Sequence, residues 1–179
     1  MAGPIQQKGM MILQGWLAGR FAQKMPISFD VSVTFEQSYG GVEGDSASLA
    51  ELLAILSALA QVPLRQDLAI TGSVNQWGEA QVIGGATHKV EGFHRACRDA
   101  GRLTRRQGVV LPAANADNLV LMPAVADDVK AGRFHVWPVA TIEQAAALFT
   151  GLDADALYEK VAKRLTDFDR ILTERARHD

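Results

Sequence analysis

The chain has 179 residues, of which 48% are hydrophobic and 21% are charged, and its formal net charge is -2. This size fits one ordinary domain with a substantial core, and no apolar run approaches the roughly 18 residues needed to cross a bilayer. The near-neutral charge gives no general attraction for nucleic acid, and the single cysteine, Cys97, excludes an internal disulfide and a multi-cysteine metal site. We therefore expect one soluble domain, residues 1–179, in a reducing compartment such as the cytoplasm, without membrane or nucleic-acid partners.

The N-terminal part predicts a helix followed by a strand. Hydrophobic residues recur at helical spacing over residues 9–23, from Met10 to Phe21. Residues 1–8 are interpreted as an added or disordered start. Over residues 29–35, hydrophobic residues alternate with polar ones, which is typical of a strand with one buried face.

The middle of the chain predicts two helices and a hairpin. The glycine-rich bend 39–45 leads into a leucine-rich helical stripe over residues 49–59. Strands at 68–72 and 80–83 are expected to pair as a hairpin. Two glycines then break the second strand, and a third helix follows that runs to Ala100.

Strands and helices alternate through the rest of the chain. The expected elements are a strand at 109–111, a helix at 124–131, a strand at 134–139, a helix at 142–149 and a long amphipathic helix over 153–179. Such alternation favours a mixed α/β sheet covered by helices.

A serine hydroxyl is a poor nucleophile unless a base takes its proton, so the base must be identified first. Histidine is the usual base, but no local signature marks the chain's histidines, which are His88, His94, His135 and His178. The Gly-x-Ser-x-Gly motif of α/β-hydrolases is absent, because Ser46 lies in Gly44-Asp-Ser-Ala-Ser48. A Ser-His-Asp hydrolase is therefore the weaker alternative.

A lysine can serve as the base if its amine is kept neutral. Its pKa must then fall by roughly 3 units from about 10.4, which costs about 4–5 kcal/mol. Burial among apolar groups and a nearby helix N-terminus both lower a lysine pKa. Lys89 fits best among the lysines, since it follows a Gly-Gly turn and would share a helical face with Ala86, Phe93 and Ala96.

Several stretches of the sequence resemble the proteolytic domain of Lon proteases. The serine region is matched by Phe35-Glu-Gln-Ser-Tyr-Gly-Gly-Val-Glu-Gly-Asp-Ser-Ala-Ser48, which is most similar to the bacterial Lon-related branch with glutamate three residues before the serine. The family's Thr-Gly strand, hairpin and Gly-Gly-x-x-x-Lys element are matched by Ala69-Ile-Thr-Gly-Ser73, Gly78-Glu79 and Val82-Ile-Gly-Gly-Ala-Thr-His-Lys89. Further similarity extends to Gly151 through Gln107-Gly-Val-Val-Leu-Pro112 and Ala114-Asn-Ala-Asp-Asn118.

This resemblance implies roles for individual residues. Ser46 matches the nucleophile and Lys89 the general base of the family's Ser-Lys dyad. Glu43 matches the acidic residue three positions before the serine, and Thr71 matches the hydroxyl that helps to position the lysine amine. The position before the base is usually acidic or polar in this family, whereas here it is His88.

The loop before the second helix is expected to complete the site. Backbone N–H groups from Gly44 to Ser46 lie at the positive end of that helix and are candidate oxyanion donors. Asp45 is expected to cap the same helix. The predicted strand 29–35 leads toward the serine, so it is our candidate edge for main-chain pairing with a peptide substrate.

Resemblance to Lon proteases also implies an α+β fold with mixed pairing, a β-hairpin and a long C-terminal helix. It implies a serine endopeptidase in a hexameric ring, coupled to an AAA+ ATPase that unfolds proteins in ATP-dependent quality control. No Gly-x-x-x-x-Gly-Lys-Ser/Thr loop occurs in the chain. We therefore expect no cofactor in this domain, and ATP and Mg²⁺ in a motor upstream in a longer protein.

Each assignment has a structural alternative. Taken singly, Ser46 reads as an ordinary helix-start residue, Lys89 as a solvated charge, Glu43 as a complement to a helix dipole and Thr71 as a strand residue. The whole domain could also be a catalytically silent Lon-like ring scaffold for an ATPase partner. The presence of both Ser46 and Lys89 favours the peptidase, because a scaffold has no use for a desolvated lysine beside a serine.

Overall fold

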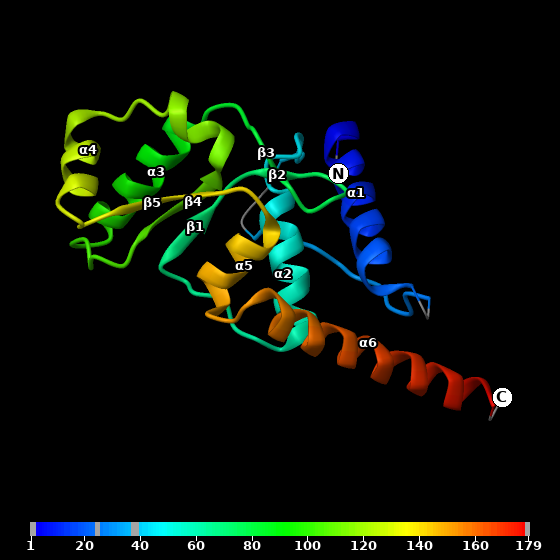
Figure 1. The fold of residues 1–179 in the computed structure, drawn as a ribbon. Coiled ribbons are helices and arrows are strands. Elements are labelled where there is room, and N and C mark those ends of the chain that lie inside the picture. The colour runs from blue at the N-terminus through cyan, green and yellow to red at the C-terminus, as the bar shows by residue number, and fades with distance from the viewer. Residues whose placement is uncertain (1–2, 24–25, 37–39, 178–179) are drawn as a thin grey trace.

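The structure is a computed structural model that describes residues 3–23, 26–36 and 40–177. Its helices in chain order are α1 (Pro4–Phe21), α2 (Ser48–Ala60), α3 (Ala86–Asp99), η1 (Ala113–Asn118, a 3-10 helix), α4 (Pro123–Lys130), α5 (Ile142–Thr150) and α6 (Ala154–Ala176). Its strands are β1 (Leu68–Ile70), β2 (Ser73–Val74), β3 (Ala80–Gln81), β4 (Gly108–Pro112) and β5 (His135–Val139). Figure 1 shows α6 leaving the body of the molecule at its C-terminal end.

Three strands form a parallel sheet in the order β1-β4-β5, and β2 and β3 form a separate antiparallel hairpin. In the sheet, Val110 of the central strand lies opposite Ile70 on one side and Trp137 on the other. Every residue of β4 is buried, which explains its continuous run of apolar residues. The α+β fold, with both kinds of pairing, a hairpin and a long C-terminal helix, is therefore as expected.

Helices cover both faces of the parallel sheet (Figure 1). On one face, Val109 and Leu111 join a hydrophobic cluster with α3, α4 and Phe134. On the other face, Val110 joins a larger cluster formed with α1, α2, α5 and α6. Adjacent residues of β4 thus point into different cores, as the period of two in a strand requires.

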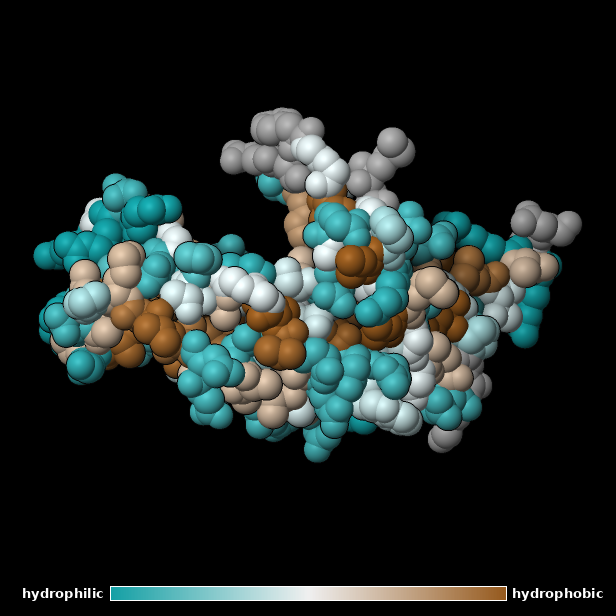
Figure 2. Space-filling model, turned by 90° about the horizontal axis from the view of Figure 1, so that it is seen from above, coloured by the Kyte–Doolittle hydropathy of each residue, from teal (hydrophilic) through white to brown (hydrophobic). Residues whose placement is uncertain are grey.

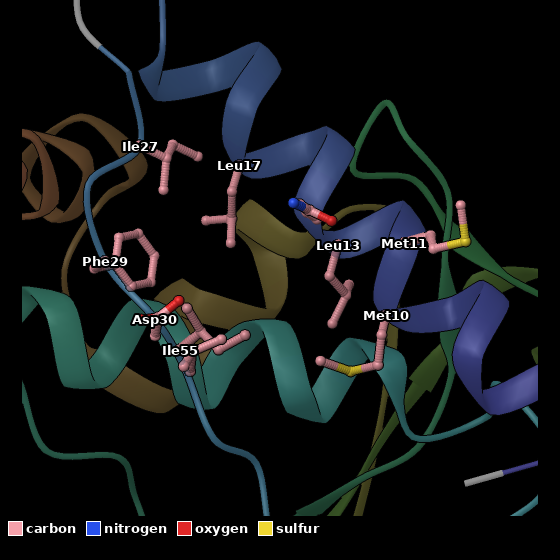
Figure 3. A pocket seen from close by; sticks show the side chains of 10 residues that line it. Met10, Met11, Leu13, Leu17, Ile27, Phe29, Asp30 and Ile55 are labelled. Carbon is pink, nitrogen blue, oxygen red and sulfur yellow. The ribbon is translucent and has the colours of Figure 1, made fainter.

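The predicted strand 29–35 is wrong, because residues 26–35 are assigned to no strand. Phe29 and Val33 are partly buried against the larger core, whereas Val31 is 46% exposed. Figure 3 shows this segment beside α1 and α2, with Phe29 near Leu17 around a pocket of about 280 Å³. The alternating pattern therefore corresponds to an extended segment with one face packed on helices. Among the described residues, no neighbouring strand forms a hydrogen-bonded ladder with it.

Two further expectations need correction. Residues 1–8 were predicted to be an added or disordered start, and disorder is wrong for residues 4–8, which form the beginning of α1 with Gln6 buried. Residues 68–70 pair in parallel with β4 instead of joining the hairpin, whose first arm is Ser73–Val74. The other predicted helices and strands are confirmed within a few residues at their ends, including the long C-terminal helix.

Part of the surface is apolar. Figure 2 shows hydrophobic side chains reaching the surface at the tapered end that contains α3 and α4 and also in the broader part of the molecule. The exposed ones include Trp77 in the hairpin loop and Val120 and Met122 before α4. No helix within the described residues is long and apolar enough to span a membrane.

Candidate active site

Ser46 lies in a turn two residues before α2, beside the carboxyl end of β1. Its carbonyl oxygen accepts hydrogen bonds from the backbone N–H of Gly72 at 2.8 Å and from the Thr71 hydroxyl at 3.3 Å. The carbonyl of Gly72 in turn accepts from the N–H of Leu49 at 3.1 Å. These bonds fasten the serine loop and the start of α2 to the residues that follow β1.

The buried Ser48 adds a second fastening, because its hydroxyl accepts from the N–H of Val74 in β2 at 3.1 Å. Gly72 is required for this close approach: a Cβ there would lie 3.0 Å from both Leu49 Cδ2 and Pro112 Cγ, and its φ of +151° disfavours other residues. Glycine is therefore strongly favoured at the point where the helix start meets the sheet edge.

Lys89 projects from the first turn of α3, where its own N–H donates to the carbonyl of Gly85. The turn before α3 is held by Asn115 of η1. The Asn115 side chain accepts from the N–H of Ile83 at 3.0 Å and donates to the carbonyl of Ile83 at 2.9 Å. Because this amide bonds both polar groups of one residue, it fixes the point from which α3 and its lysine start.

The two segments bring Lys89 and Ser46 together. Lys89 Nζ lies 3.0 Å from Ser46 Oγ and 3.1 Å from Thr71 Oγ1. Within the described part of the chain Lys89 makes no ion pair, and burial lowers the pKa of its amine. Lys89 is nevertheless an exposed residue, so its head group is less enclosed than the sequence led us to expect.

Of the expected supporting residues, Thr71 lies in the site and is buried. The carboxylate of Glu43 instead accepts from the backbone N–H of Ile5 in α1 at 3.0 Å. Asp45 was expected to cap α2, which is wrong, because the N-cap is Ala47 and has no side-chain bond. The Asp45 carboxylate lies 3.6 Å from Lys8 Nζ.

The backbone before α2 is shaped by Gly44, whose φ is +96°. The backbone N–H groups of Asp45 and Ser46 donate no hydrogen bond to any residue that the structure describes. They lie just before the positive end of α2 and are free to bind an anionic oxygen.

No histidine in the described residues hydrogen-bonds Ser46. His94 is buried against Asp128 at 2.7 Å, and His135 contacts the carbonyl of Arg105. His88 is exposed on α3. No group of metal-ligating side chains occurs in the part of the chain that the structure describes. The arrangement is therefore that of a serine with a lysine as its candidate base.

Sequence reasoning missed three residues that support this arrangement: Gly72, Ser48 and Asn115. All three lie inside or beside the stretches that match the Lon pattern, but Gly72 and Asn115 carry no reactive side chain, and the Ser48 hydroxyl was not distinguished from that of Ser46 by any expected role. A signal existed only for Gly72, because glycine directly after a strand end often marks a close backbone approach.

The fold and the site define an α+β domain with a serine–lysine pair at the edge of a parallel sheet. Residues 23–148 match the family model described as the Lon protease (S16) C-terminal proteolytic domain. The chain belongs to this family.

Curated relatives give the same result. The chain is 46% identical over 152 residues to a Lon protease homolog of Escherichia coli (strain K12), covering 85% of this chain and 26% of the relative. It is 44% identical over 153 residues to a Lon protease homolog of Haemophilus influenzae, and the match covers 86% of this chain and 25% of the relative. It is 40% identical over 139 residues to the archaeal Lon protease of Thermococcus kodakarensis, and the match covers 76% of this chain and 20% of the relative. The chain thus spans about a quarter or less of the length of these relatives.

Proposed function

We propose that the chain is a serine endopeptidase domain in which Ser46 is the nucleophile and Lys89 the general base. The observation that carries the proposal is the 3.0 Å distance between Lys89 Nζ and Ser46 Oγ in a lysine whose pKa is lowered by burial. The neutral amine takes the hydroxyl proton while Ser46 Oγ attacks a peptide carbonyl carbon. The resulting ammonium then protonates the leaving amine, and water hydrolyses the acyl-enzyme.

Two neighbouring features support this chemistry. Thr71 Oγ1, at 3.1 Å from the amine, orients the lysine without adding a negative charge that would keep it protonated. The free N–H groups of Asp45 and Ser46 are the proposed oxyanion donors, each with a value of about 3–4 kcal/mol in comparable sites.

The exposure of Lys89 points to a site that becomes enclosed when it works. A base active near neutral pH needs a pKa about 3 units below that of a free lysine, and a solvated amine does not reach that value. A peptide substrate lying over the amine would exclude water, and so would a neighbouring subunit. Residues 29–35 form no strand in the structure. Main-chain pairing of a peptide substrate with this segment stays a prediction.

The wider context is also a proposal. Because the relatives are about four or five times longer than the matched region, we propose that this domain works with an upstream AAA+ ATPase that uses ATP and Mg²⁺. A hexameric ring that encloses the active sites would restrict cleavage to unfolded chains, in the cytoplasm as the single cysteine suggests. The chain by itself should therefore cleave only unstructured peptides. ATP-stimulated digestion of a folded protein by this chain alone would contradict the proposal.

The decisive experiment is labelling with a fluorophosphonate probe, followed by mass-spectrometric mapping of the modified residue. We expect wild type to be labelled on Ser46 and Lys89→Ala to be labelled about 10²–10⁴-fold more slowly, which is the usual contribution of a general base. Lys130→Ala, at an exposed position on α4, is the matched control and should label like wild type. An unlabelled wild type in every assembly state would instead favour the ring scaffold.

A further inference from the structure

The first turn of α1 lies against the loop that carries Ser46. The backbone N–H of Gly3 donates to the carbonyl of Val42 at 2.8 Å, and the N–H of Ile5 donates to Glu43 Oε1 at 3.0 Å. The start of α1 therefore binds two successive residues of the loop, through the backbone of Val42 and the side chain of Glu43.

Two contacts continue along the second turn of α1. Lys8 Nζ lies 3.6 Å from the carboxylate of Asp45. Gly9 packs beside Asp45 and Ser48, since a Cβ on Gly9 would lie 3.5 Å and 3.8 Å from their β carbons. α1 thus follows the loop from Val42 to the start of α2.

Glu43 provides a group that α1 lacks. The N-cap of α1 is Gly3, which has no capping side chain, and the first turn of the helix contains no acidic residue. The positive end of a helix favours an anion, and the carboxylate of Glu43 occupies that position from a distant segment of the chain. The fit is close, because a Cβ on Gly3 would overlap Glu43 Oε2.

We propose that Glu43 is a positioning residue that caps α1 and thereby holds the Ser46 loop in place, and that it does not act on Lys89 directly. This inference rests on the proposed function and deepens it. It assigns to Glu43 a partner in α1, whereas a charge partner of the lysine would have to lie beside the amine. With α1 in contact, Ser46 Oγ stands at hydrogen-bond distance from Lys89. Loss of the α1 contact is therefore expected to disturb the dyad geometry.

The experiment measures the rate of Ser46 labelling by the fluorophosphonate probe against pH in wild type, Glu43→Gln, Glu43→Ala, Gly3→Ala and Gly3→Ala/Glu43→Ala. Glutamine keeps an oxygen that accepts from Ile5, so Glu43→Gln should retain at least about a third of the wild-type rate, whereas Glu43→Ala should lose about tenfold. The pH midpoint should stay unchanged in both, because no charge beside Lys89 has been removed.

The Gly3 variant tests the contact from the side of α1. Its new Cβ expels the carboxylate, so Gly3→Ala should also lose about tenfold. The double variant should match Glu43→Ala within about twofold, since both changes break one contact. Gly15→Ala is the matched control on the same helix, because apart from its chain neighbours and the backbone of its own helix no atom lies within 4 Å of the added carbon, and it should not lower the rate.

The outcomes separate this proposal from the peptidase function. A fall in the pH midpoint in both Glu43 variants would overturn the positioning role, because loss of a neighbouring negative charge lowers a lysine pKa. Additive losses in the double variant would also overturn it, and neither result affects the assignment of Ser46 and Lys89. Absence of labelling in wild type would overturn the peptidase function, and the positioning role with it.

Discussion

The helix α3 contributes to two polar clusters that differ in their charge balance. The first, near its start, contains Lys89 with the hydroxyls of Ser46 and Thr71. It holds a potential cation, and among the described residues no carboxylate pairs with it. Burial therefore lowers the pKa of Lys89 with nothing to oppose the effect.

The second cluster, further along α3, surrounds the buried carboxylate of Asp128 in α4. This carboxylate lies 2.7 Å from His94 Nε2, 3.2 Å from Arg98 Nη1 and 2.6 Å from Arg133 Nε. The hydrogen bonds from His94 and Arg133 lower the pKa of Asp128 to about 2. An ion with counter-ions around it stabilises the structure, whereas a lysine that has hydroxyl partners but no described counter-ion is the arrangement expected of the proposed base. The comparison teaches that the candidate site differs from the structural cluster in the absence of a described counter-ion as well as in the presence of the lysine.

Removing the carboxylate of the second cluster should have the largest effect. Asp128→Ala leaves the buried His94 and its arginine neighbours without their partner, so we expect the free energy of unfolding to fall by about 3–5 kcal/mol. Urea unfolding measures the change. Asp127→Ala, at the adjacent exposed position, should stay within about 0.5 kcal/mol of wild type. Equal losses in the two variants would show that the cluster is not a stabilising unit.

Adding a carboxylate beside Lys89 should give the first cluster a counter-ion, as in the second cluster, and should abolish the proposed activity. In Thr71→Asp the new anion favours the protonated lysine and raises its pKa by about 1–3 units. The midpoint of the pH–labelling profile should rise, and the rate at pH 7 should fall by about 10²-fold. Thr71→Asn isolates the electrostatic effect, because asparagine has the shape of aspartate but no charge. If the aspartate and asparagine variants have the same midpoint, the counter-ion explanation is wrong.

Acid should weaken the second cluster with a smaller effect. The pKa of Asp128 is lowered from 3.8 to about 2 in the folded protein, so its contribution to stability is present above about pH 4 and is lost as the pH falls toward 2. This contribution is at most about 2–3 kcal/mol. Urea unfolding of wild type and Asp128→Asn between pH 5 and 2 should therefore show a steeper loss in wild type; parallel curves would contradict it.

Local sequence patterns determined much of the fold. α2, α3 and α6 were predicted because their apolar residues follow the helical period, and each helix is amphipathic without reference to its neighbours. The pair of Ser46 and Lys89 was predicted because the serine motif and the Gly-Gly-x-x-x-Lys element resemble those of Lon proteases. Such signals are carried by residues close together in the chain, so one sequence is enough to read them.

Only the tertiary structure decided which distant groups meet. Residues 29–35 have the period of a strand but no ladder, because a strand needs hydrogen-bonding partners that no local pattern specifies. Likewise, Asn115 binds Ile83, and Glu43 lies on the first turn of α1 rather than beside Lys89. The residue types were visible in the sequence, but their partners depend on how helices and strands pack in three dimensions.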